Sequence, residues 1–394
     1  MTLQTALSGL LGAQTGLNTV SNDLANASTT AFKSQTALFS DIYPANQSNV
    51  AGIGVSTSSI ASNFTQGSLV ATGNPLDAAL QGSGYFVVSQ NGQQQYTRDG
   101  SFQLNGQGQL VTATGAQVMG YAATQTGSLS ATLSPLTVNT GAQGANPTSQ
   151  LGLTLNLNSG DPVIPATTSF SAANAATYDQ ATSVVTYDSL GNANRIGLYF
   201  VQNPPATGGT GTSGWTVYAQ PASATGATVG TPQTLSTLSF SPSGQLISGS
   251  PATLNVNWGN GAANSAIQFD LTGTTLGAQS FAVAGITNNG YPPGSYTGTS
   301  ISSSGGLMST YSNGQTLSAG TLSIANFINQ TGLQAVSGNL FASSQTSGQP
   351  VLDIPGVGQA GSISGGNLEQ SNASTSSLLV SLIQYQQAYQ ANTS

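Results

Sequence analysis

The first residues of the chain repeat apolar positions with the period of a helix. Five leucines share one heptad stripe: Leu3, Leu7, Leu10, Leu17 and Leu24. The pattern stops where the sequence turns polar at 26–30, and it predicts an amphipathic helix about 33 Å long. Such a helix is marginal by itself, because most helical stability comes from packing the apolar face against another surface. The stripe therefore needs a partner.

The last residues of the chain show a similar pattern. Four positions spaced by four, three and four residues form a second stripe: Leu378, Leu382, Tyr385 and Tyr389. The two helices could pair within one chain and cap a core, or their stripes could be completed by neighbouring subunits. We favour the second interpretation, because neither helix adjoins a segment in the sequence that could cover it. The nine stripe residues are therefore predicted to form a subunit interface.

Between the helices, strand and turn signals predict a mainly β fold. Residues 30–74 are rich in Ser, Thr and Asn and indicate an extended connector. From residue 84, short apolar strands alternate with Asn91-Gly92, Asp99-Gly100 and Asn105-Gly106. Such pairs are favoured in two-residue hairpin turns, because both central residues need positive φ. A β-meander is expected there, and strand alternation resumes around Asn313-Gly314.

A second β block, from about 151 to 283, interrupts this meander. It begins after a Gly/Ala/Asn linker and ends at a Pro/Gly turn, so one β domain is inserted into another. The predicted division is terminal helices at 1–29 with 366–394, a connector at 30–74, a split β domain at 75–145 with 284–365, and an inserted outer β domain at 146–283. The predicted fold class is mainly β, with two nested β domains flanked by N- and C-terminal α-helices that form a coiled-coil-like inner domain.

The composition supports folded domains but leaves almost no charge. Apolar residues make up 38% of the chain, with 12 Phe and 13 Tyr, too much for a disordered protein. Only 3% of the residues are charged, and the cations are Lys33, Arg98 and Arg195. Three cations cannot form a basic patch, which excludes nucleic-acid binding, and salt-bridge networks are not expected either. Subunit contacts must rest on apolar burial and neutral hydrogen bonds, which salt hardly screens.

Catalysis and cofactor binding lack their usual residues. Without His or Cys there is no thiolate nucleophile, no Cys-ligated metal and no group that titrates near neutrality by default. Glycine runs at 209–214 and 356–361 fit the dinucleotide-binding spacing, but 50 glycines make chance matches expected, and neither run opens a predicted helix. We expect no enzyme and no cofactor. Calcium binding would need the fold to gather four carboxylates: Asp161, Asp179, Asp188 and Asp270.

Other conspicuous residues have plain structural interpretations. Asp188 precedes Ser-Leu-Gly and is expected to form a turn, while Arg98 and Asp99 are expected as a hairpin-turn pair at the surface. Trp215 and Trp258 are interpreted as core residues of the insert, with an intersubunit patch as the alternative. No run of about 20 apolar residues indicates a membrane-spanning helix. The N-terminus also lacks the basic region of a secretory signal.

Four motifs lie at the two ends and in the split domain. The N-terminal motif comprises Ser21-Asn22-Asp23-Leu24-Ala25-Asn26 and Thr30-Ala31-Phe32-Lys33. The split domain carries Tyr96-Thr97-Arg98-Asp99-Gly100 and Tyr311-Ser312-Asn313-Gly314-Gln315, and the C-terminal motif includes Leu368-Glu369-Gln370-Ser371-Asn372. Together these motifs resemble the signatures of bacterial flagellar rod and hook proteins. The motif positions carried over from that family are Asn22, Asn26, Phe32, Asn313, Gly314, Ser371 and Asn372.

The resemblance implies a structural subunit. Rod proteins of this family are shorter and lack an outer domain of this size, so the insert favours the hook. A hook subunit implies a homopolymer, a curved hollow helical tube that acts as a universal joint and transmits torque from rod to filament. Its implied partners are rod, hook-cap and hook–filament junction proteins, at the extracellular hook and basal body, without membrane insertion. A distal rod protein of the same family and a secreted β-rich adhesin stay as alternatives.

The resemblance also implies secretion through the flagellar type III export apparatus without a cleaved signal. The family's export-recognition element is a Phe followed four residues later by an apolar residue, and Phe39 and Tyr43 match it. The alternative is that both residues merely pack the connector. Three residues depart from the family pattern: Asp23 replaces a usual Asn, Ala31 a usual Gly, and Tyr385 a polar or methionine-type residue.

Overall fold

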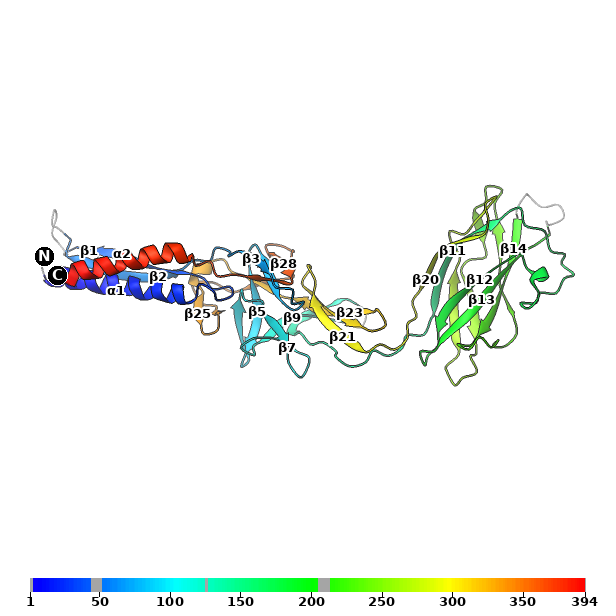
Figure 1. Cartoon of the computed structure of the whole chain (residues 1–394), viewed down its shortest axis with the longest axis horizontal. Coiled ribbons are helices and arrows are strands. Elements are labelled where there is room, and N and C mark those ends of the chain that lie inside the picture. The colour runs from blue at the N-terminus through cyan, green and yellow to red at the C-terminus, as the bar shows by residue number, and fades with distance from the viewer. Residues whose placement is uncertain (1–2, 44–51, 125–126, 205–212, 394) are drawn as a thin grey trace. The chain divides into compact units, whose positions relative to one another are not determined.

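The computed structural model describes residues 3–43, 52–124, 127–204 and 213–393, and the chain divides into two compact units (Figure 1). We call the first the helix-bearing unit; it comprises Met1–Thr140, Thr297–Thr310 and Thr316–Ser394. The second, the sandwich unit, comprises Gly141–Tyr296 and Tyr311–Gln315. Strands dominate both units, and the helices at the two ends of the chain pack together. The predicted fold class, mainly β with paired terminal helices, is confirmed.

The helix-bearing unit is built from both ends of the chain. Its N-terminal part contains α1 (Leu3–Ala25), β1 (Gln35–Ile42), β2 (Gly54–Ser62), β3 (Leu69–Ala71), β4 (Ala78–Gln81), β5 (Tyr85–Gln90), β6 (Gln93–Thr97), β7 (Phe102–Leu104), β8 (Leu110–Thr112), β9 (Gln117–Ala123) and β10 (Leu129–Pro135). Its C-terminal part contains β21 (Tyr296–Ile301), β22 (Gly306–Tyr311), β23 (Thr316–Leu322), β24 (Ile324–Asn326), the short 3₁₀ helix η2 (Gln330–Gly332), β25 (Gln334–Val336), β26 (Leu340–Ala342), β27 (Val351–Asp353), β28 (Ser362–Gly365), β29 (Asn367–Glu369) and α2 (Thr375–Thr393).

Strand β5 is the centre of the β part of this unit. It pairs with β6, with β9 and with β24, and its first four residues are buried. The β5–β6 hairpin turns at Asn91-Gly92, whose φ angles of 53° and 79° are those that the sequence pair predicts. The expected hairpin at Asp99-Gly100 is wrong, because β7 pairs with β8 and not with β6. A β-carbon on Gly100 would overlap the carbonyl oxygen of Ala78, so this glycine permits a close backbone approach.

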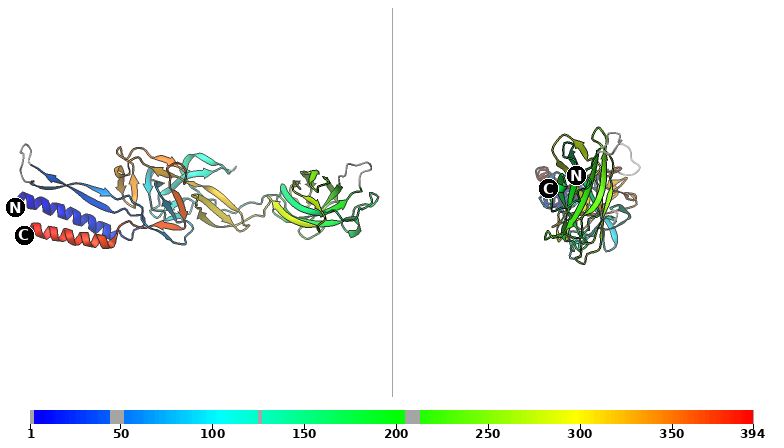
Figure 2. Two further views of the ribbon diagram at one scale, coloured as in Figure 1. Left: turned by 90° about the horizontal axis from the view of Figure 1, so that it is seen from above. Right: turned by 90° about the vertical axis from the view of Figure 1, so that its right-hand side faces the viewer.

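Strands from the two ends of the chain pair with each other. β3 pairs with β29 and β4 pairs with β28, both antiparallel, with Val70 opposite Leu368 and Leu80 opposite Ile363. Residues 30–74, expected as an extended connector, contain β3 and also the antiparallel hairpin β1–β2, which lies along α1 (Figure 2). The tip of this hairpin, at 44–51, lies outside the described residues. Closing the unit thus requires both ends of the chain.

The sandwich unit consists of two five-stranded sheets. One contains β11 (Gln150–Asn158), β17 (Ala252–Val256), β18 (Ser265–Asp270), β19 (Thr275–Gly277) and β20 (Ala282–Asn288). The other contains β12 (Gln180–Tyr187), β13 (Ala193–Gln202), β14 (Ser213–Ala222), β15 (Gln233–Phe240) and β16 (Leu246–Ser248), and the 3₁₀ helix η1 (Ala175–Thr177) precedes it. Both sheets bury alternate residues in one shared core. Trp215 and Trp258 lie in that core, so their interpretation as core residues is confirmed.

Candidate assembly interface

Helices α1 and α2 run antiparallel and approach closely through small residues of α1 (Figure 2). A β-carbon on Gly9 would lie 2.8 Å from Asn392 Oδ1, and one on Gly16 would overlap the ring of Tyr385. The two glycines are seven residues apart, as are their two partners, so the contact follows a heptad-like register. The intrachain helix pair therefore rests on glycines, which the leucine stripe did not indicate.

The opposite side of α1 packs on the β1–β2 hairpin. A β-carbon on Gly12 would lie 3.3 Å from Val55 Cγ1 and 3.6 Å from Phe39 Cε1, and the Val55 N–H donates to Ser8 Oγ at 3.2 Å. At the end of the helix, the Gln35 N–H donates to Asp23 Oδ2 at 2.8 Å. The residues that α1 buries are mostly small or polar: Gly12, Ala13, Gly16, Thr19, Val20 and Asp23.

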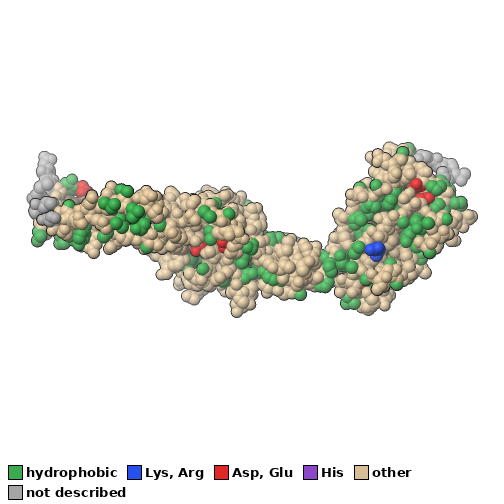
Figure 3. All heavy atoms as spheres, in the orientation of Figure 1, with side chains coloured by type: hydrophobic (Ala, Val, Ile, Leu, Met, Phe, Trp, Pro, Cys, Tyr) green, Lys and Arg blue, Asp and Glu red, His purple; other side chains and the backbone are tan. Residues whose placement is uncertain are grey.

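The nine predicted interface residues all keep some exposure, and each of them lies in the described part of the chain. Leu3 and Leu7 are 87% and 55% exposed, Tyr389 is also exposed, and the other six are half-buried. In α2, whose residues are all described, no side chain is buried, and Leu379, Val380 and Ile383 are exposed beside the predicted stripe. The space-filling view shows hydrophobic side chains along the helix pair and few charged ones (Figure 3). The helix pair thus leaves several large apolar side chains exposed, although Tyr385, one of the nine, packs against Gly16 of α1.

The two residues expected to take part in export lie on the hairpin strand β1 and just after it. Phe39 is partly exposed and faces Gly12 of α1, whereas Tyr43 is 62% exposed. The partial packing of Phe39 agrees with the alternative that it supports the hairpin, and it leaves the export role of Phe39 and Tyr43 as a prediction. If the export apparatus binds the unfolded chain, Phe39 can be recognised there and still pack on α1 after folding.

The N-terminal and C-terminal motif positions mostly secure chain turns. Asn26 donates through Nδ2 to the carbonyl oxygen of Asn22 at 2.9 Å, at the end of α1. Asn372 Oδ1 accepts the Ser34 N–H at 2.8 Å, and the Asn372 N–H donates to the carbonyl oxygen of Phe32. These contacts bring the chain after α1 against the chain before α2.

The remaining motif positions also stabilise local backbone. Ser371 Oγ accepts the Ala373 N–H at 3.2 Å, just before α2. In the sandwich unit, Asn313 donates to the carbonyl oxygen of Pro292 at 2.8 Å, and Gly314 has a φ of 78° in the β22–β23 turn. Ala31, where the family pattern has Gly, has a φ of 56°, a left-handed conformation that favours glycine. The structure therefore gives a physical reason for the usual glycine.

The helix-bearing unit contains a buried cluster of ion pairs that the sequence patterns do not predict. Lys33 Nζ lies 2.6 Å from Glu369 Oε1, and Arg98 NH1 lies 3.4 Å from Glu369 Oε2, with all three side chains buried. The expectations of a surface Arg98–Asp99 pair and of no salt-bridge network are wrong. Lys33 and Glu369 are the only lysine and the only glutamate in the chain, and that rarity was the one signal available in the sequence.

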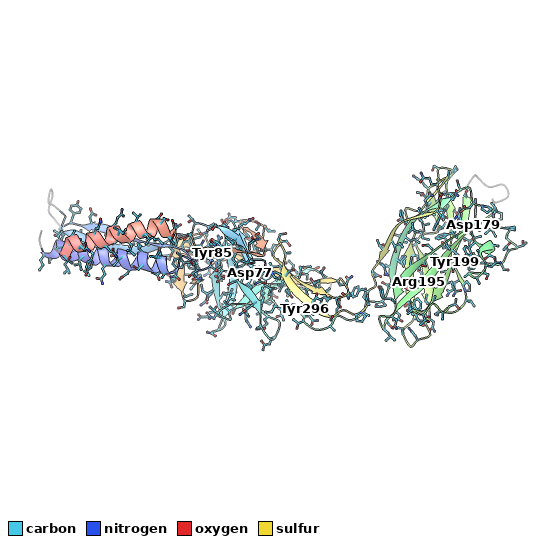
Figure 4. The ribbon with its side chains drawn as sticks, viewed as in Figure 1. Asp77, Tyr85, Asp179, Arg195, Tyr199 and Tyr296 are labelled. Atoms are coloured by element: carbon cyan, nitrogen blue, oxygen red, sulfur yellow. The ribbon has the colours of Figure 1, made fainter. Side chains whose placement is uncertain are left out.

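Burial controls the ionisation of this cluster. It lowers the pKa of Lys33 below the usual 10.5, although the hydrogen bond and charge of Glu369 counteract the shift. Tyr85, labelled in Figure 4, has its ring centre 5.4 Å from Arg98 Cζ, and burial raises the pKa of its hydroxyl. At Asp23, burial likewise raises the pKa, against the lowering effect of the Gln35 N–H.

The aspartates of the sandwich unit have structural roles. Asp188 is buried and accepts the N–H groups of Leu190 and Asn192, both at 2.9 Å, so its predicted turn role is confirmed. Burial disfavours its charge, but hydrogen bonds that include those of Asn192 and Asn260 outweigh it and lower the pKa of Asp188 to about 2. Burial also raises the pKa of Asp179.

We next consider the candidate metal ligands and the glycine runs in the part of the chain that the structure describes. Within those ranges, no three His, Cys, Asp or Glu side chains lie close enough to hold a metal ion, so the four aspartates of the insert are not gathered. The glycine run at 356–361 forms turns between β27 and β28, and 209–212 of the other run lies outside the described residues. No described helix is long and apolar enough to cross a membrane.

Three family models match successive parts of the chain. The flagellar hook protein FlgE/F/G D1 domain matches residues 79–147, and the flagellar basal body protein FlaE D2 domain matches residues 154–291. The C-terminal domain of the flagellar basal body rod FlgEFG proteins matches residues 364–394. The second match covers most of the insert, for which the sequence motifs pointed to no relative.

Similar proteins span the full length of the chain. It is 36% identical to the flagellar hook protein FlgE of Escherichia coli strain K12 and 35% identical to that of Salmonella typhimurium, with 100% of this chain and 96% of each relative covered. The flagellar hook protein FlgE of Brucella suis is 30% identical over 99% of this chain and 94% of its own. The crystal structure of Helicobacter pylori flagellar hook protein FlgE2 has a similar fold, with a TM-score of 0.57, 15% identity, and coverage of 75% of this chain and 98% of that one. The chain therefore belongs to the flagellar hook protein family.

Proposed function

We propose that this chain polymerises into the hollow tube of the flagellar hook through the apolar side chains that α1 and α2 leave exposed. One observation carries the proposal: α1 buries mostly small and polar residues within the chain, while the nine predicted interface residues all stay partly or fully accessible. Packing through glycines brings the helices close and leaves their large side chains for other copies. The family is a structural one, consistent with a subunit and not an enzyme.

The energetics favour assembly by apolar burial. Fully burying one exposed Leu, Val or Ile side chain contributes about 1.5–3 kcal/mol, and each helix exposes three of them: Leu3, Leu7 and Leu11 on α1, and Leu379, Val380 and Ile383 on α2. Their burial can drive association even after the cost of ordering. Charge contributes little, because α2 contains no ionisable side chain except Tyr385 and Tyr389, and α1 contains only the buried Asp23. The same near-neutral surface allows copies to pack side by side without like-charge repulsion.

The finer features of the proposal are those that the resemblance of the sequence motifs implies. The tube would be curved and would act as a universal joint that transmits torque, with rod, hook-cap and hook–filament junction proteins at its ends. The chain would leave the cell through the type III export apparatus, with Phe39 and Tyr43 as the recognition element. The terminal helices at 1–29 with 366–394 would line the channel, the split β domain would form the middle shell, and the insert at 146–283 would lie outside.

Electron microscopy of the purified full chain tests this proposal. We expect curved hollow tubes from the natural sequence and none from a variant that combines Leu3→Ser with Leu7→Ser. The matched control is Leu190→Ser in the sandwich unit, because Leu190 is 59% exposed and Leu7 is 55% exposed. Straight tubes would instead favour a distal rod protein. Normal tubes from the double variant, or a chain that never polymerises, would refute the proposal.

A further inference from the structure

Three of the sequence motifs meet at one buried point of the helix-bearing unit. Lys33 ends the N-terminal motif, Arg98 lies in the motif of the split domain, and Glu369 lies in the C-terminal motif. Sequence separations of 336 and 271 residues divide Glu369 from Lys33 and Arg98. The family relationship and the assembly surface described above leave this convergence unexplained.

Glu369 accepts hydrogen bonds from both cations and from one backbone amide. Glu369 Oε1 accepts Lys33 Nζ at 2.6 Å and the Gly67 N–H at 2.9 Å, while Oε2 accepts from Arg98 NH1 at 3.4 Å. Both cations are also held by the backbone, because Lys33 Nζ donates to the carbonyl oxygen of Thr65 at 2.9 Å. In the same way, Arg98 NH2 donates to the carbonyl oxygen of Gly82 at 2.7 Å. Side chains from three distant segments thus fix one another's positions.

Neutral contacts reinforce the ion cluster at the same place. The Ala31 N–H donates to the carbonyl oxygen of Glu369 at 2.8 Å. Asn372, three residues further on, accepts the Ser34 N–H and donates to the carbonyl oxygen of Asn63 at 2.8 Å. Hydrogen bonds therefore join the segment that follows α1 to the segment that precedes α2, beside the strand pairs β3–β29 and β4–β28.

Stability alone does not explain the choice of charged residues. A buried ion pair is often no more stabilising than apolar residues of the same size, because desolvation offsets the attraction. Here two cations share one carboxylate, and Arg98 Nε has no hydrogen-bond partner among the described residues. Such a cluster fixes the orientation of the three segments relative to one another. Its hydrogen bonds form in few arrangements of the segments, whereas an apolar contact can form in many.

We propose that Lys33, Arg98 and Glu369 are positioning residues that hold both terminal segments against the split β domain. We call these three side chains the latch. Because Lys33 and Glu369 come from opposite ends of the chain, their ion pair forms only when both terminal segments are folded. The latch rests on the proposed function in one respect: the orientation that it sets is that of the helix pair used in assembly.

Hydrogen exchange of the full chain in its unpolymerised form tests the latch. Glu369→Gln leaves two buried cations without a counter-charge, and we expect exchange in α1, α2 and the β1–β2 hairpin to accelerate by at least about a hundredfold. The matched control is Arg195→Met, which removes an exposed cation from the sandwich unit (Figure 4) and should leave exchange in the terminal segments unchanged. The sandwich unit serves as the internal reference.

A second variant separates charge from packing. Adding Lys33→Met to Glu369→Gln removes one of the two uncompensated cations, so it should restore at least about tenfold of the lost protection. A purely packing role predicts the opposite, because two truncated contacts would add their losses. The proposal is overturned if the second substitution makes exchange faster still, or if terminal segments of the natural chain show no protection that the variants could lose.

Polymerisation of the same variants distinguishes the latch from the proposed function. We expect Glu369→Gln to form irregular tubes or none, while Arg195→Met forms normal ones. If Glu369→Gln forms normal tubes, the positioning role is overturned and the proposed function stands. If even the natural chain forms no tubes, the proposed function is refuted, and the exchange pattern of the free chain still decides whether the latch holds the ends.

Discussion

The ring of Tyr385 occupies the place where a β-carbon on Gly16 would lie. This contact sets how closely α1 and α2 approach, and it explains why a glycine lies in the middle of a helix, where it costs about 0.5–1 kcal/mol relative to alanine. The same spacing recurs between Gly9 and Asn392, one heptad further along the pair. The close approach of the two backbones leaves other large side chains exposed, among them Leu7, Leu11 and Ile383.

Gly16→Ala should therefore destabilise the helix pair even though alanine is the better helix former. We expect a net loss of about 1 kcal/mol or more, because overpacking costs typically about 1–3 kcal/mol and exceeds the gain in propensity. The measurement is hydrogen exchange in α1 and α2. Asn18→Ala, at an exposed position of α1, is the control and should slow exchange slightly. Slower exchange in both variants would show that the Tyr385 contact is unimportant.

Asp23→Asn should stabilise the helix-bearing unit at pH 7. Asp23 Oδ2 accepts the Gln35 N–H, while Oδ1 has no partner among the described residues, and burial raises the pKa of the carboxyl. A raised folded-state pKa means that ionisation at neutral pH opposes folding, and that the penalty fades as the pH falls through that pKa. An asparagine keeps the acceptor and carries no charge.

Thermal unfolding at several pH values measures this effect. We expect Asp23→Asn to raise the melting temperature at pH 7 and to leave it nearly unchanged near pH 3, where the natural carboxyl is protonated in both states. Asp41→Asn, which removes the charge of an exposed aspartate, is the control. A lower melting temperature for Asp23→Asn at pH 7 would contradict the expected gain.

The assembled tube should resist salt. Because α2 carries no Lys, Arg, Asp or Glu and α1 carries only the buried Asp23, screening has almost nothing to weaken between the helices. We expect the fraction of pelleted polymer to stay constant or rise slightly between about 0.05 M and about 1 M NaCl. Depolymerisation at the higher salt concentration would indicate that ion pairs between copies hold the tube together.

The sandwich unit should lose stability only in strong acid. Hydrogen bonds lower the pKa of Asp188 to about 2, from an ordinary value of 3.8, so the stability it contributes is present above about pH 4 and is lost as the pH falls through about 2. Asp188→Asn should destabilise this unit at pH 7, because its new amide would face the donors Asn194 Nδ2 and Asn260 Nδ2. Unfolding followed by tryptophan fluorescence measures both effects, since Trp215 and Trp258 lie in the sandwich core.

Asp161→Asn is the matched control for this aspartate. Asp161 lies in the same unit, is only half-buried and accepts Gln180 Nε2 at 2.8 Å, so the same change of charge should have a smaller effect there. If both variants unfold at the same temperature at pH 7, the hydrogen bonds around Asp188 do not contribute the expected stability. The pH dependence below about 4 should become weaker in Asp188→Asn but not vanish, because hydrogen bonds from Thr272 and Ser250 also lower the pKa of Asp270 in this unit.

Two predictions from the sequence are wrong for the same physical reason. Charged residues usually lie at the surface, which predicts an exposed Arg98, and the Asp99-Gly100 pair favours a hairpin turn. In the fold, Gly100 approaches the backbone of Ala78, and Arg98 points into the buried cluster with Glu369. Neither contact has a signal in the neighbouring residues, because each partner lies elsewhere in the chain.

The sequence by itself determined what depends on neighbouring residues: the two amphipathic helices, the Asn91-Gly92 hairpin, the core position of the tryptophans and the motifs of the family. Only the tertiary structure decided which residues separated by hundreds of positions come together. The contacts of Gly16 with Tyr385 and of Lys33 with Glu369 form only when the two ends of the chain come together. Helix periodicity and turn propensity carry no information about which distant segments meet. Local preferences act over a few residues, whereas the packing of the ends is a property of the complete fold.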